Sequence, residues 1–237
     1  MVVEPPQYEG VLQRENAAKI LNALTTMCGE ASFSEIAKRS GLKGNTLTHN
    51  LNTLIKRGII EAHHKGIYTL TYKTPLAYIY DAPTPKIYLG LLGNKTQNKE
   101  PETLVALSLL EKEGLQFDQV YVTTSQNALE QWATHPKTEN WKWITLTSHQ
   151  GKEDIAHIDA VKQKVEQQLV TLLKKHVVIM DCTSATKPAT IAYYELAQKY
   201  LVPLIYVYEP QKTLTWLIDK QTILKRLGNK NTTNPTQ

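Results

Sequence analysis

The first sixty residues of the chain repeat apolar side chains at the spacing of an α-helix. One helix is predicted from about Glu15 to Met27, where apolar residues recur every three or four positions. A second helix is predicted over 33–39, because Ser32 and Glu35 have the spacing of a capping box, in which each side chain binds the other residue's backbone amide. The predicted inner face of the first helix consists of Ala18, Leu21 and Leu24, together with Ala17 or Ile20.

A third helix and a two-stranded hairpin complete this pattern. The helix is expected to have Asn45 as its N-cap and to end at Gly58, since glycine readily takes the left-handed conformation that ends a helix. The hairpin consists of strands at 59–62 and 67–70, joined by the tight turn 63–66. Three helices and a β-wing are the elements of a winged helix-turn-helix domain. The apolar face of the third helix is Leu47, Leu51, Leu54 and Ile55.

After the hairpin the pattern changes to short apolar runs separated by helical stretches. Three prolines within 75–85 mark the change. Alternating strands and helices predict an α/β fold with a Rossmann-like, mostly parallel sheet. We therefore expect domains at 1–80 and 81–228, followed by a disordered polar tail at 229–237. The predicted strands are 86–92, 119–124, 142–147, 177–180 and 204–208, and the predicted helices are about 101–114, 154–175 and 188–200.

The positive charge of the chain is concentrated in the first predicted domain. The 237 residues include 27 Lys and Arg against 22 Asp and Glu, a formal charge of +5. Seven of the basic residues but only one acidic residue lie within 38–73. Such a concentration favours contact with nucleic-acid phosphates, and we expect this domain to bind double-stranded DNA. A winged helix used only for dimerisation or protein contacts is the alternative.

The expected DNA contacts divide into two kinds. Basic side chains on the third helix and the wing would bind phosphates, and short polar side chains on the third helix would reach base edges in the major groove. The phosphate-binding residues are expected to be Lys43, Lys56, Arg57 and Lys65, and the base-reading residues Asn45, Thr46, Thr48, His49 and Asn52.

Composition and residue spacing exclude several other classes of protein. The two cysteines, Cys28 and Cys182, are far apart and supply neither a disulfide framework nor a four-ligand zinc site. The seven histidines show no metal-binding spacing, so no metal is expected. No apolar run approaches the roughly 20 residues that cross a bilayer, and the N-terminus lacks the pattern of a signal peptide. We therefore expect a cytoplasmic protein without a membrane contact.

Three loops at the predicted carboxyl ends of strands are rich in hydroxyl and amide groups. In a parallel sheet these ends lie along one edge, where ligands bind next to helix N-termini. None of the loops contains a glycine-rich dinucleotide motif or a P-loop. The third loop, 181–188, could hold an anion, although a threonine that caps the following helix explains its hydroxyls equally well. The candidate ligand-binding residues are Gly93, Asn94, Lys95 and Thr96 in the first loop, Thr124, Ser125 and Gln126 in the second, and Thr183, Ser184, Ala185, Thr186 and Lys187 in the third.

The third loop also carries a motif. It reads Asp181-x-Thr183-Ser184-Ala185-Thr186-Lys187-Pro188 and resembles the D-x-T-G-G-T-K-P motif of CRISPR-associated Rossmann-fold (CARF) domains. Gly93-Asn94 resembles the first ligand loop of that family, and the resemblance spans about 86–220. The N-terminal segment, with S-x-x-E-I-A-K-R-S-G-L, resembles winged helix-turn-helix domains of small archaeal and bacterial regulators.

The CARF resemblance implies a homodimer whose loops surround a two-fold axis and bind a cyclic oligoadenylate, most often cyclic tetra-adenylate. It implies that Thr186 and Lys187 approach the phosphates or ribose hydroxyls, with the first loop on the opposite rim. Ser184 and Ala185 replace the two glycines of the motif, so we expect the backbone there to be less free to take a positive φ.

Together, these features predict a CRISPR-associated, ligand-responsive DNA-binding transcriptional regulator in antiviral defence. Ligand would change DNA affinity only by binding one dimer arrangement better than another, and we expect the coupling to pass through 75–85. The alternative is an enzyme, because some CARF proteins resemble metal-independent ring nucleases that degrade cyclic tetra-adenylate and switch off type III CRISPR signalling. Lys187 and Asn94 would then be catalytic, stabilising the charge that develops as a ribose 2′ hydroxyl attacks a phosphate. A third interpretation is a regulator that responds to another nucleotide or to a protein.

Overall fold

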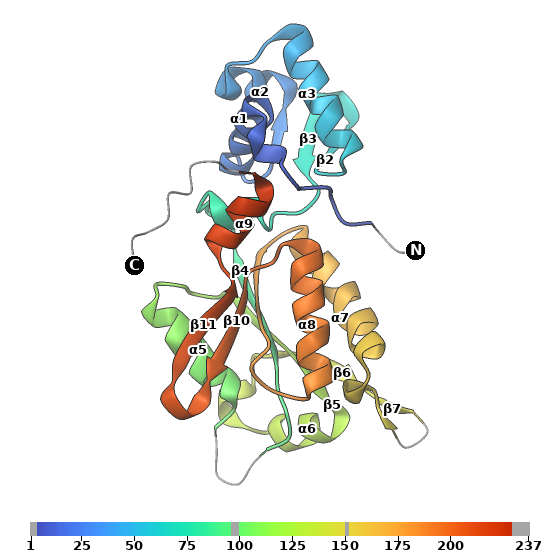
Figure 1. The fold of residues 1–237 in the computed structure, drawn as a ribbon, viewed down its shortest axis with the longest axis vertical. Helices are drawn as coiled ribbons and strands as arrows, with labels where there is room; N and C mark the ends of the chain where they lie inside the picture. The colour runs from blue at the N-terminus through green and yellow to red at the C-terminus, as the bar shows by residue number, and fades with distance from the viewer. Residues whose placement is uncertain (1–3, 96–99, 150–151, 229–237) are drawn as a thin grey trace. The chain divides into compact units, whose positions relative to one another are not determined.

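The chain in this computed structural model is organised in two units, each held together by its own contacts (Figure 1). The structure describes residues 4–95, 100–149 and 152–228. We call the two parts the N-terminal unit and the sheet unit. The N-terminal unit contains the chain up to Thr84, Leu173–Val177 and the chain from Asp219 onwards, and the sheet unit contains Pro85–Leu172 and Val178–Ile218. The backbone therefore passes between the units four times.

The end of the chain lies in a different unit from the one that its sequence position suggests. We grouped 81–228 in one predicted domain, whereas the segment from Asp219 onwards belongs to the N-terminal unit. Its helix α9, Lys220–Leu227, contacts η1, Val11–Gln13, and α4, Leu76–Ile79. The predicted tail at 229–237 lies outside the described residues.

The N-terminal unit contains the predicted winged helix-turn-helix elements. Its elements are α1 Glu15–Thr26, β1 Glu30–Ser32, α2 Phe33–Ser40, α3 Gly44–Lys56, β2 Ile60–His63, η2 His64–Gly66 and β3 Ile67–Leu70. The capping box is confirmed, because the Glu35 amide donates to Ser32 Oγ at 3.3 Å and the Ser32 amide donates to Glu35 Oε2 at 2.8 Å. Strand β1 was not predicted; it pairs with β3 in an antiparallel sheet of order β1-β3-β2.

The start of the third helix was predicted wrongly. Asn45 is not its N-cap, because α3 begins at Gly44 and Lys43 occupies the capping position without a side-chain hydrogen bond. Gly44 has a φ of 51°, a left-handed value that glycine adopts without strain, and it stands one residue before Asn45 at the start of the helix. Asn45 lies exposed in the first turn of α3.

The apolar faces of the three helices form the core of this unit. Gly58, with a φ of 67°, ends α3 as predicted, and its amide donates to the carbonyl of Ile55 at 2.8 Å. Of the apolar positions predicted to face inward, only Ala18 and Ile55 remain partly exposed. The buried members of these faces are Ala17, Ile20, Leu21, Leu24, Leu47, Leu51 and Leu54, and Ile36 of α2 is buried as well.

A six-stranded sheet forms the centre of the sheet unit, in the order β11-β10-β9-β4-β5-β6. The pairs β4–β5, β5–β6 and β9–β10 are parallel, and β10–β11 is antiparallel. The predicted Rossmann-like, mostly parallel sheet is therefore confirmed, although β11 was not predicted. The strands are β4 Lys86–Leu91, β5 Gln119–Ser125, β6 Lys142–Leu146, β9 Val177–Asp181, β10 Leu204–Tyr208 and β11 Thr213–Ile218.

The strand order places a topological switch point between β4 and β9. From β4 the chain continues to β5 and β6 on one side, and it then crosses to β9 and β10 on the other side. Ligands of such sheets bind outside the carboxyl ends of the two strands at the switch point. Here, β4 leads into the first candidate loop and β9 leads into the third.

Helices pack against the sheet, and two of them lie side by side (Figure 1). The helices are α5 Glu102–Lys112, α6 Gln126–Trp132, α7 Ile158–Leu173 and α8 Lys187–Tyr200. Ion pairs join α7 to α8, with Lys162 Nζ 2.6 Å from Glu195 Oε2 and Lys199 Nζ 2.7 Å from Glu166 Oε1. One flank of α8 is therefore occupied by α7.

Several elements were missed or misplaced by the sequence prediction. Helix α6 and the small hairpin of β7, Ser148–His149, and β8, Lys152–Glu153, were not predicted. The helix expected over 154–175 begins only at Ile158, because Asp154–Ala156 forms a 3-10 turn, η4.

We expect Ser32→Ala to lower the free energy of unfolding by about 1 kcal/mol, because the hydroxyl that accepts from the Glu35 amide is lost. Urea unfolding followed by circular dichroism measures this change. Lys38→Ala, in the same helix but outside the capping box, is the control and should change the free energy by less than about 0.5 kcal/mol. Equal effects of the two substitutions would contradict the assigned role of Ser32.

Candidate ligand site and nucleic-acid interface

The first and third candidate loops meet at the switch point. The Gly93 amide donates to Ser184 Oγ at 3.1 Å, and Ser184 is buried. A Cβ atom on Gly93 would lie 3.4 Å from the Ala185 backbone, an ordinary van der Waals contact, so the backbones of the two loops lie next to each other at this point. The structure thus brings these two sets of predicted residues together.

The third loop takes a positive φ without a glycine. We expected the Ser184-Ala185 pair to leave the backbone less free to take a positive φ, and Ala185 nevertheless has a φ of 70°. A non-glycine residue in this region is strained, and surrounding contacts must hold it there. The hydrogen bond between Ser184 and Gly93 is one such contact.

Hydrogen bonds on both sides of Ala185 fix the third loop. Thr183 Oγ1 accepts from the Val207 amide of β10 at 2.8 Å. Thr186 caps α8 by accepting from the Ala189 amide at 3.3 Å, and its hydroxyl donates to the carbonyl of Ile155 at 2.6 Å. Thr186 therefore caps the helix, as the alternative interpretation of the loop predicted. Its hydroxyl already forms hydrogen bonds within the protein.

A buried carboxylate lies beneath this loop. Asp181, at the end of β9, accepts hydrogen bonds from the Thr183 amide at 2.8 Å, from the Thr183 hydroxyl and from the Tyr88 hydroxyl. Burial raises the pKa of Asp181 to about 6, although these hydrogen bonds oppose the rise by stabilising the charged form. Close by, Tyr193 of α8 donates to Thr123 Oγ1 at 2.7 Å. The base of the loop is thus a polar network inside the sheet.

The first loop is anchored by helix α6. Trp132 Nε1 donates to the carbonyl of Gly93 at 2.9 Å, and the Lys95 amide donates to Gln131 Oε1 at 2.6 Å. Lys95 Nζ lies 5.4 Å from the centre of the Trp132 ring, within reach of a cation–π contact. Thr96, another predicted member of this loop, lies outside the described residues.

The second candidate loop is not a loop. Strand β5 continues to Ser125, which pairs with Leu146 of β6, and α6 begins at the next residue. Thr124 is buried and donates to the carbonyl of Leu92 at 2.7 Å, and Ser125 caps α6 by accepting from the Ala128 amide. Gln126 is exposed and donates to Glu130 Oε1 at 3.1 Å. Thr124 and Ser125 therefore support the neighbouring loop from within the fold.

Three predicted residues remain exposed at the paired loops, Asn94 and Lys95 of the first loop and Lys187 at the start of α8. The supporting residues Trp132, Tyr88 and Tyr193 were not among the predicted site residues. They come from other strands and helices, and only the fold brings them to the loops. No local motif in the sequence could have indicated them.

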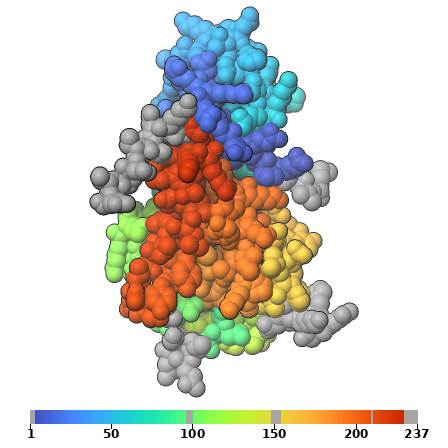
Figure 2. All heavy atoms as spheres, in the orientation of Figure 1, coloured from blue at the N-terminus to red at the C-terminus, as the bar shows by residue number. Residues whose placement is uncertain are grey.

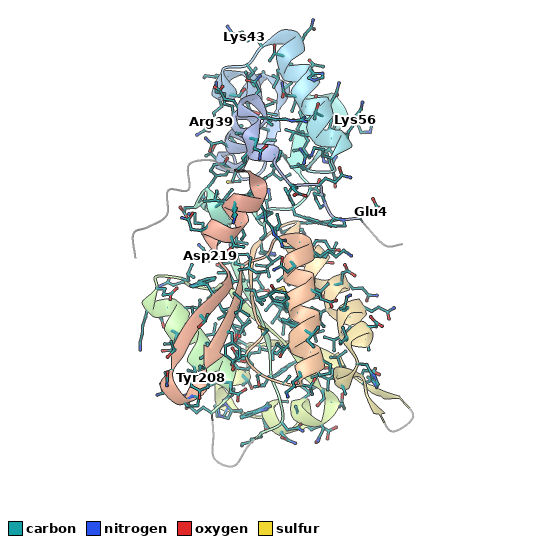
Figure 3. All side chains as sticks on the ribbon, viewed as in Figure 1. Glu4, Arg39, Lys43, Lys56, Tyr208 and Asp219 are labelled. Atoms are coloured by element: carbon teal, nitrogen blue, oxygen red, sulfur yellow. The ribbon has the colours of Figure 1, made fainter. Side chains whose placement is uncertain are left out.

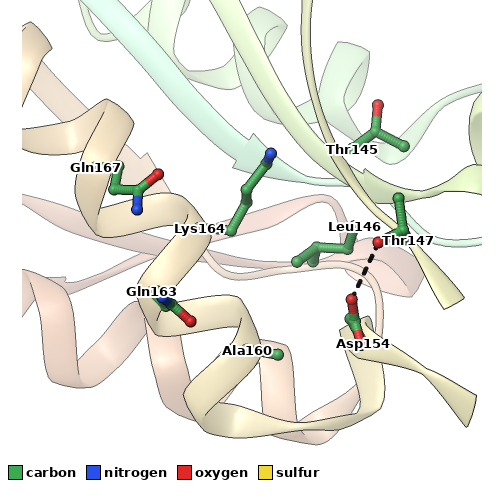
Figure 4. Close-up of a pocket in the computed structure, with 8 residues that line it drawn as sticks. All are labelled: Thr145, Leu146, Thr147, Asp154, Ala160, Gln163, Lys164 and Gln167. Atoms are coloured by element: carbon green, nitrogen blue, oxygen red, sulfur yellow. Dashed lines mark hydrogen bonds between the residues drawn. The ribbon is translucent and has the colours of Figure 1, made fainter. Parts of the chain in front are cut away.

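A separate pocket lies along β6 and α7 (Figure 4). Its side chains are mostly polar, and a hydrogen bond of 3.2 Å joins Thr147 Oγ1 to Asp154 Oδ2. None of the predicted ligand residues lines it. The lining residues are Thr145, Leu146, Thr147, Asp154, Ala160, Gln163, Lys164 and Gln167.

Within residues 4–95, 100–149 and 152–228, no group of three or more His, Cys, Asp and Glu side chains is arranged to hold a metal ion. In the same ranges, no helix combines the length and the apolar character needed to cross a membrane.

The candidate nucleic-acid interface is the exposed side of α3 together with the wing. Lys43 and Lys56 lie at opposite ends of α3 (Figure 3). Lys65 lies at the tip of the wing, where Lys65 and Gly66 take φ values of 65° and 70°. The predicted residues that are exposed are Lys43, Asn45, Thr46, Thr48, His49, Asn52, Lys56 and Lys65.

Arg57 differs from the other predicted DNA contacts. Its Nε donates to the carbonyl of Gln7 at 2.8 Å, and its Nη2 donates to the carbonyl of Glu9. Burial and the nearby Arg14 lower the pKa of the Arg57 guanidinium. This side chain is thus engaged in holding the N-terminal segment.

Residues 15–64 match the family model of the IclR helix-turn-helix domain. The three helices and the wing seen in the structure agree with the helix-turn-helix fold that this match indicates. The N-terminal unit contains a winged helix-turn-helix domain. A comparison with curated proteins finds no match to the chain.

Three solved structures with a similar arrangement span parts of the chain. Can2 from Sulfobacillus thermosulfidooxidans, in complex with cyclic tetra-adenylate, is 16% identical over 57% of this chain and 35% of its own, with a TM-score of 0.41. Protein VC1899 from Vibrio cholerae is 11% identical over 57% of this chain and 34% of its own, with a TM-score of 0.43. Enterococcus italicus Csm6, bound to cyclic hexa-2'-fluoro-hexa-dAMP, is 16% identical over 64% of this chain and 41% of its own, with a TM-score of 0.42. The chain thus matches less than half of each of these proteins.

The pKa of Asp181 leads to a testable pH dependence. Because the folded pKa is about 6 and the ordinary value is 3.8, the folded protein favours the protonated carboxyl. The stability contributed by Asp181 should be fully present below pH 3.8 and lost as the pH rises through 6, a change of about 3 kcal/mol. Wild type should therefore gain stability relative to Asp181→Asn as the pH falls from 7 to 4, measured by urea unfolding.

The other carboxylates titrate in both wild type and Asp181→Asn, so their contributions cancel in the difference between the two free energies of unfolding. Glu139→Gln, at an exposed carboxylate, is the control, and its difference from wild type should change little over the same range. A pH-independent difference between wild type and Asp181→Asn would refute the assignment.

Proposed function

We propose that the protein is a CARF-type regulator that binds double-stranded DNA through its winged helix-turn-helix domain and a cyclic oligoadenylate, most simply cyclic tetra-adenylate, through its sheet unit. The observation that carries the ligand half of this proposal is the hydrogen bond between Gly93 and Ser184. It joins the two motif-bearing loops at the switch point of the sheet, where ligands of this architecture bind.

The DNA half is supported by the shape and charge of the N-terminal unit. Helix α3 exposes short polar side chains between lysines at its two ends, and the wing adds Lys65. A helix of this composition suits a major groove flanked by phosphates. Since Arg57 is bound to backbone carbonyls, the phosphate contacts are assigned to Lys43, Lys56 and Lys65.

The ligand half is supported by the chemistry that the two loops present. Lys187 lies in the first turn of α8, a helix of 14 residues. Its positive charge and the N-terminal end of the helix both favour a phosphate. Asn94 and Lys95 are exposed on the first loop and supply further donors to phosphate or ribose oxygens.

Coupling between the two halves would follow the backbone. Strand β11 ends at Ile218, and the next residue, Asp219, caps α9 in the N-terminal unit by accepting from the Thr222 amide at 2.7 Å. A ligand that displaced the edge of the sheet would thereby act directly on α9. It would change DNA affinity only if it bound two arrangements of the protein unequally. The connection at 75–85 would be a second route.

A second candidate function is a metal-independent ring nuclease. The specific observation in its favour is that Asn94 and Lys187 lie exposed on loops that the Gly93–Ser184 bond joins. Lys187 could stabilise the negative charge that develops on a phosphate while the adjacent 2′ hydroxyl attacks it. The ligand would then be a substrate, and its cleavage would end the signal.

Substitutions in α3 and the wing should separate two kinds of DNA contact. Lys43→Ala or Lys65→Ala should weaken binding to every duplex and reduce the slope of log affinity against log salt by about 0.9 for each lost phosphate contact. Asn45→Ala or His49→Ala should instead reduce discrimination between sequences by about 1–3 kcal/mol. Fluorescence anisotropy on a selected duplex and a shuffled one measures both effects.

The control for the DNA experiment is Lys112→Ala, which removes a positive charge from α5 in the sheet unit. It should leave DNA affinity within about twofold of wild type. A uniform loss for all four interface variants would argue against the division between phosphate and base contacts, and absence of DNA binding by wild type would refute this half of the proposal.

Removal of Lys187 tests the ligand site. Lys187→Ala should weaken binding of cyclic tetra-adenylate about 10- to 100-fold, because one charge-assisted hydrogen bond is lost. Lys142→Ala, an exposed lysine on β6, is the control with the same change of charge. Bound and cleaved nucleotide should be followed over time without added metal.

The products of that incubation distinguish the two candidate functions. An intact ligand that stays bound supports a sensor, whereas cleavage that disappears in Lys187→Ala supports a ring nuclease. If wild type does not bind cyclic tetra-adenylate at all, the proposed ligand is wrong.

A further inference from the structure

A further cavity lies wholly within the N-terminal unit, between its first residues and the end of helix α3. Gln7, Gln13 and Arg14 line it from the N-terminal segment, and Lys56 and Arg57 line it from the end of α3. Its volume is about 510 Å³, within the range of about 300–1,000 Å³ that is typical of small-molecule sites. We call it the basic cavity.

Positive charge dominates the lining of the basic cavity. Arg14, Lys56 and Arg57 are cations, and Glu9 is the only anion among the described residues that line it, so the net charge is +2. Burial lowers the pKa of the Arg57 guanidinium, and repulsion from Arg14 lowers it further, although Glu9 opposes the shift. A cleft lined by one sign of charge attracts ions of the opposite sign. An anion between these side chains would relieve the repulsion.

Arg14 and Lys56 are not engaged by the rest of the described chain. Both side chains are exposed, and neither forms a hydrogen bond or an ion pair with another described residue. Lys19 on the same helix α1 differs, because its Nζ lies 2.7 Å from Glu15 Oε1. The cations of the basic cavity are therefore available to a ligand, whereas this nearby lysine is paired.

Arg57 supplies a positive charge in a fixed position. Its Nε donates to the carbonyl of Gln7 at 2.8 Å, and its Nη2 donates to the carbonyl of Glu9. These two bonds orient the plane of the guanidinium and hold the N-terminal segment against the end of α3. One cation of the cavity therefore also joins its two walls.

The N-terminal segment is held on its other side by α9. Helix α9 contacts η1, and the Gly10 amide donates to the carbonyl of Arg226 at 3.0 Å. In Figure 2 the blue atoms of this segment lie against the red atoms of α9. The wall that carries Arg14 is therefore formed before a ligand binds, which lowers the entropic cost of binding.

Helix dipoles explain only part of this arrangement. Basic residues at the C-terminal end of a helix stabilise its last carbonyls, and this accounts for Lys56 and Arg57. Arg14 occupies the N-cap of α1, where its side chain caps no amide and a positive charge is unfavourable to the helix. Its position is explained if an anion binds between Arg14 and the end of α3.

We propose that the basic cavity binds the phosphate group of a small molecule, a nucleotide or another phosphate monoester, with Arg14 and Lys56 as donors and Arg57 as a fixed charge. The two charges of a phosphate monoester match the net charge of the cavity. Guanidinium groups bind phosphate through paired hydrogen bonds, and lysine binds it as a point charge. A concave site suits a small ligand better than it suits the convex backbone of a duplex.

A ligand in the basic cavity would weaken DNA binding. Lys56 is one of the lysines assigned to DNA phosphates, and a phosphate bound to it would compete with the duplex. DNA affinity would then respond to a phosphorylated small molecule independently of the sheet unit. This regulatory part rests on the proposed function, whereas phosphate binding itself does not.

Thermal unfolding of the full chain with inorganic phosphate as the probe tests the site. At equal pH and ionic strength, phosphate in about tenfold excess over its dissociation constant should raise the unfolding temperature of wild type by about 3 °C relative to chloride. Arg14→Gln should show less than about a third of this rise. Arg39→Gln, the same change at an exposed arginine of α2 away from Lys56 (Figure 3), is the control and should respond as wild type does. Equal responses of wild type and Arg14→Gln would overturn the site.

A second variant, Gln13→Glu, keeps the test decisive if Arg14→Gln does not fold. Gln13 is exposed and lines the cavity, and the substitution adds a carboxylate with little change in shape. This carboxylate would take the place of the ligand. The response to phosphate should therefore fall, and the unfolding temperature in chloride should rise. An undiminished response to phosphate would contradict the proposal.

DNA binding distinguishes a small ligand from a phosphate of the duplex. Replacing chloride by phosphate at equal ionic strength should lower the DNA affinity of wild type about three- to tenfold, and that of Arg14→Gln less than about twofold. Suppose instead that phosphate leaves the unfolding temperature unchanged and that Arg14→Gln reduces the slope of log affinity against log salt by about 0.9. The cavity would then bind the DNA backbone, and the proposed small ligand would be wrong. If wild type does not bind DNA, the unfolding experiment still decides whether the site exists, and only the regulatory part fails.

Discussion

The shape of the third loop depends on a carboxylate buried at the end of a central strand. Removing Asp181 from water is unfavourable, and its raised pKa records this penalty. Hydrogen bonds from Thr183 and Tyr88 offset part of it, and they draw the chain into a tight turn directly after β9. That turn presents Ser184 to Gly93 and leads into α8. The positions of Lys187 and of the rest of α8 therefore depend on the buried carboxylate of Asp181.

Regular amphipathic elements were predictable from the sequence, and elements that depend on distant partners were not. Helices α1 to α3 and strands β4, β5, β6, β9 and β10 have clear apolar patterns of their own. Strand β11 was missed because its threonines face outward and its remaining residues are stabilised only by pairing with β10 and packing on α5. Helix α9 is short, and its contacts with η1 and α4 come from residues more than 130 positions earlier in the chain.

In the candidate site, too, local sequence motifs were predictable, whereas contacts between residues far apart in the sequence were not. The sequence identified the hydroxyl-rich segments, but it could not distinguish a hydroxyl that binds a ligand from one that caps a helix. Thr124 and Ser125 were assigned to the ligand, although parallel pairing with β6 extends the strand through both residues. The positive φ of Ala185 was unexpected because a local rule favours glycine there, whereas a contact from Ser184 to a loop about ninety residues earlier helps to hold the turn. Tertiary contacts overrode local preference at Ala185.

The assignment of α9 to the N-terminal unit has a consequence for how the protein is made. Gly10 donates its amide to the carbonyl of Arg226 at 3.0 Å, and Ile223 and Leu227 of α9 are fully buried. On the ribosome, the helices and the wing of the winged helix-turn-helix domain emerge first, but α9 emerges only after all of the sheet unit. Domains generally fold in order during synthesis, and here that order is broken. The unit that begins first is completed last, so the N-terminal unit reaches its full set of contacts only after the sheet unit has been synthesised.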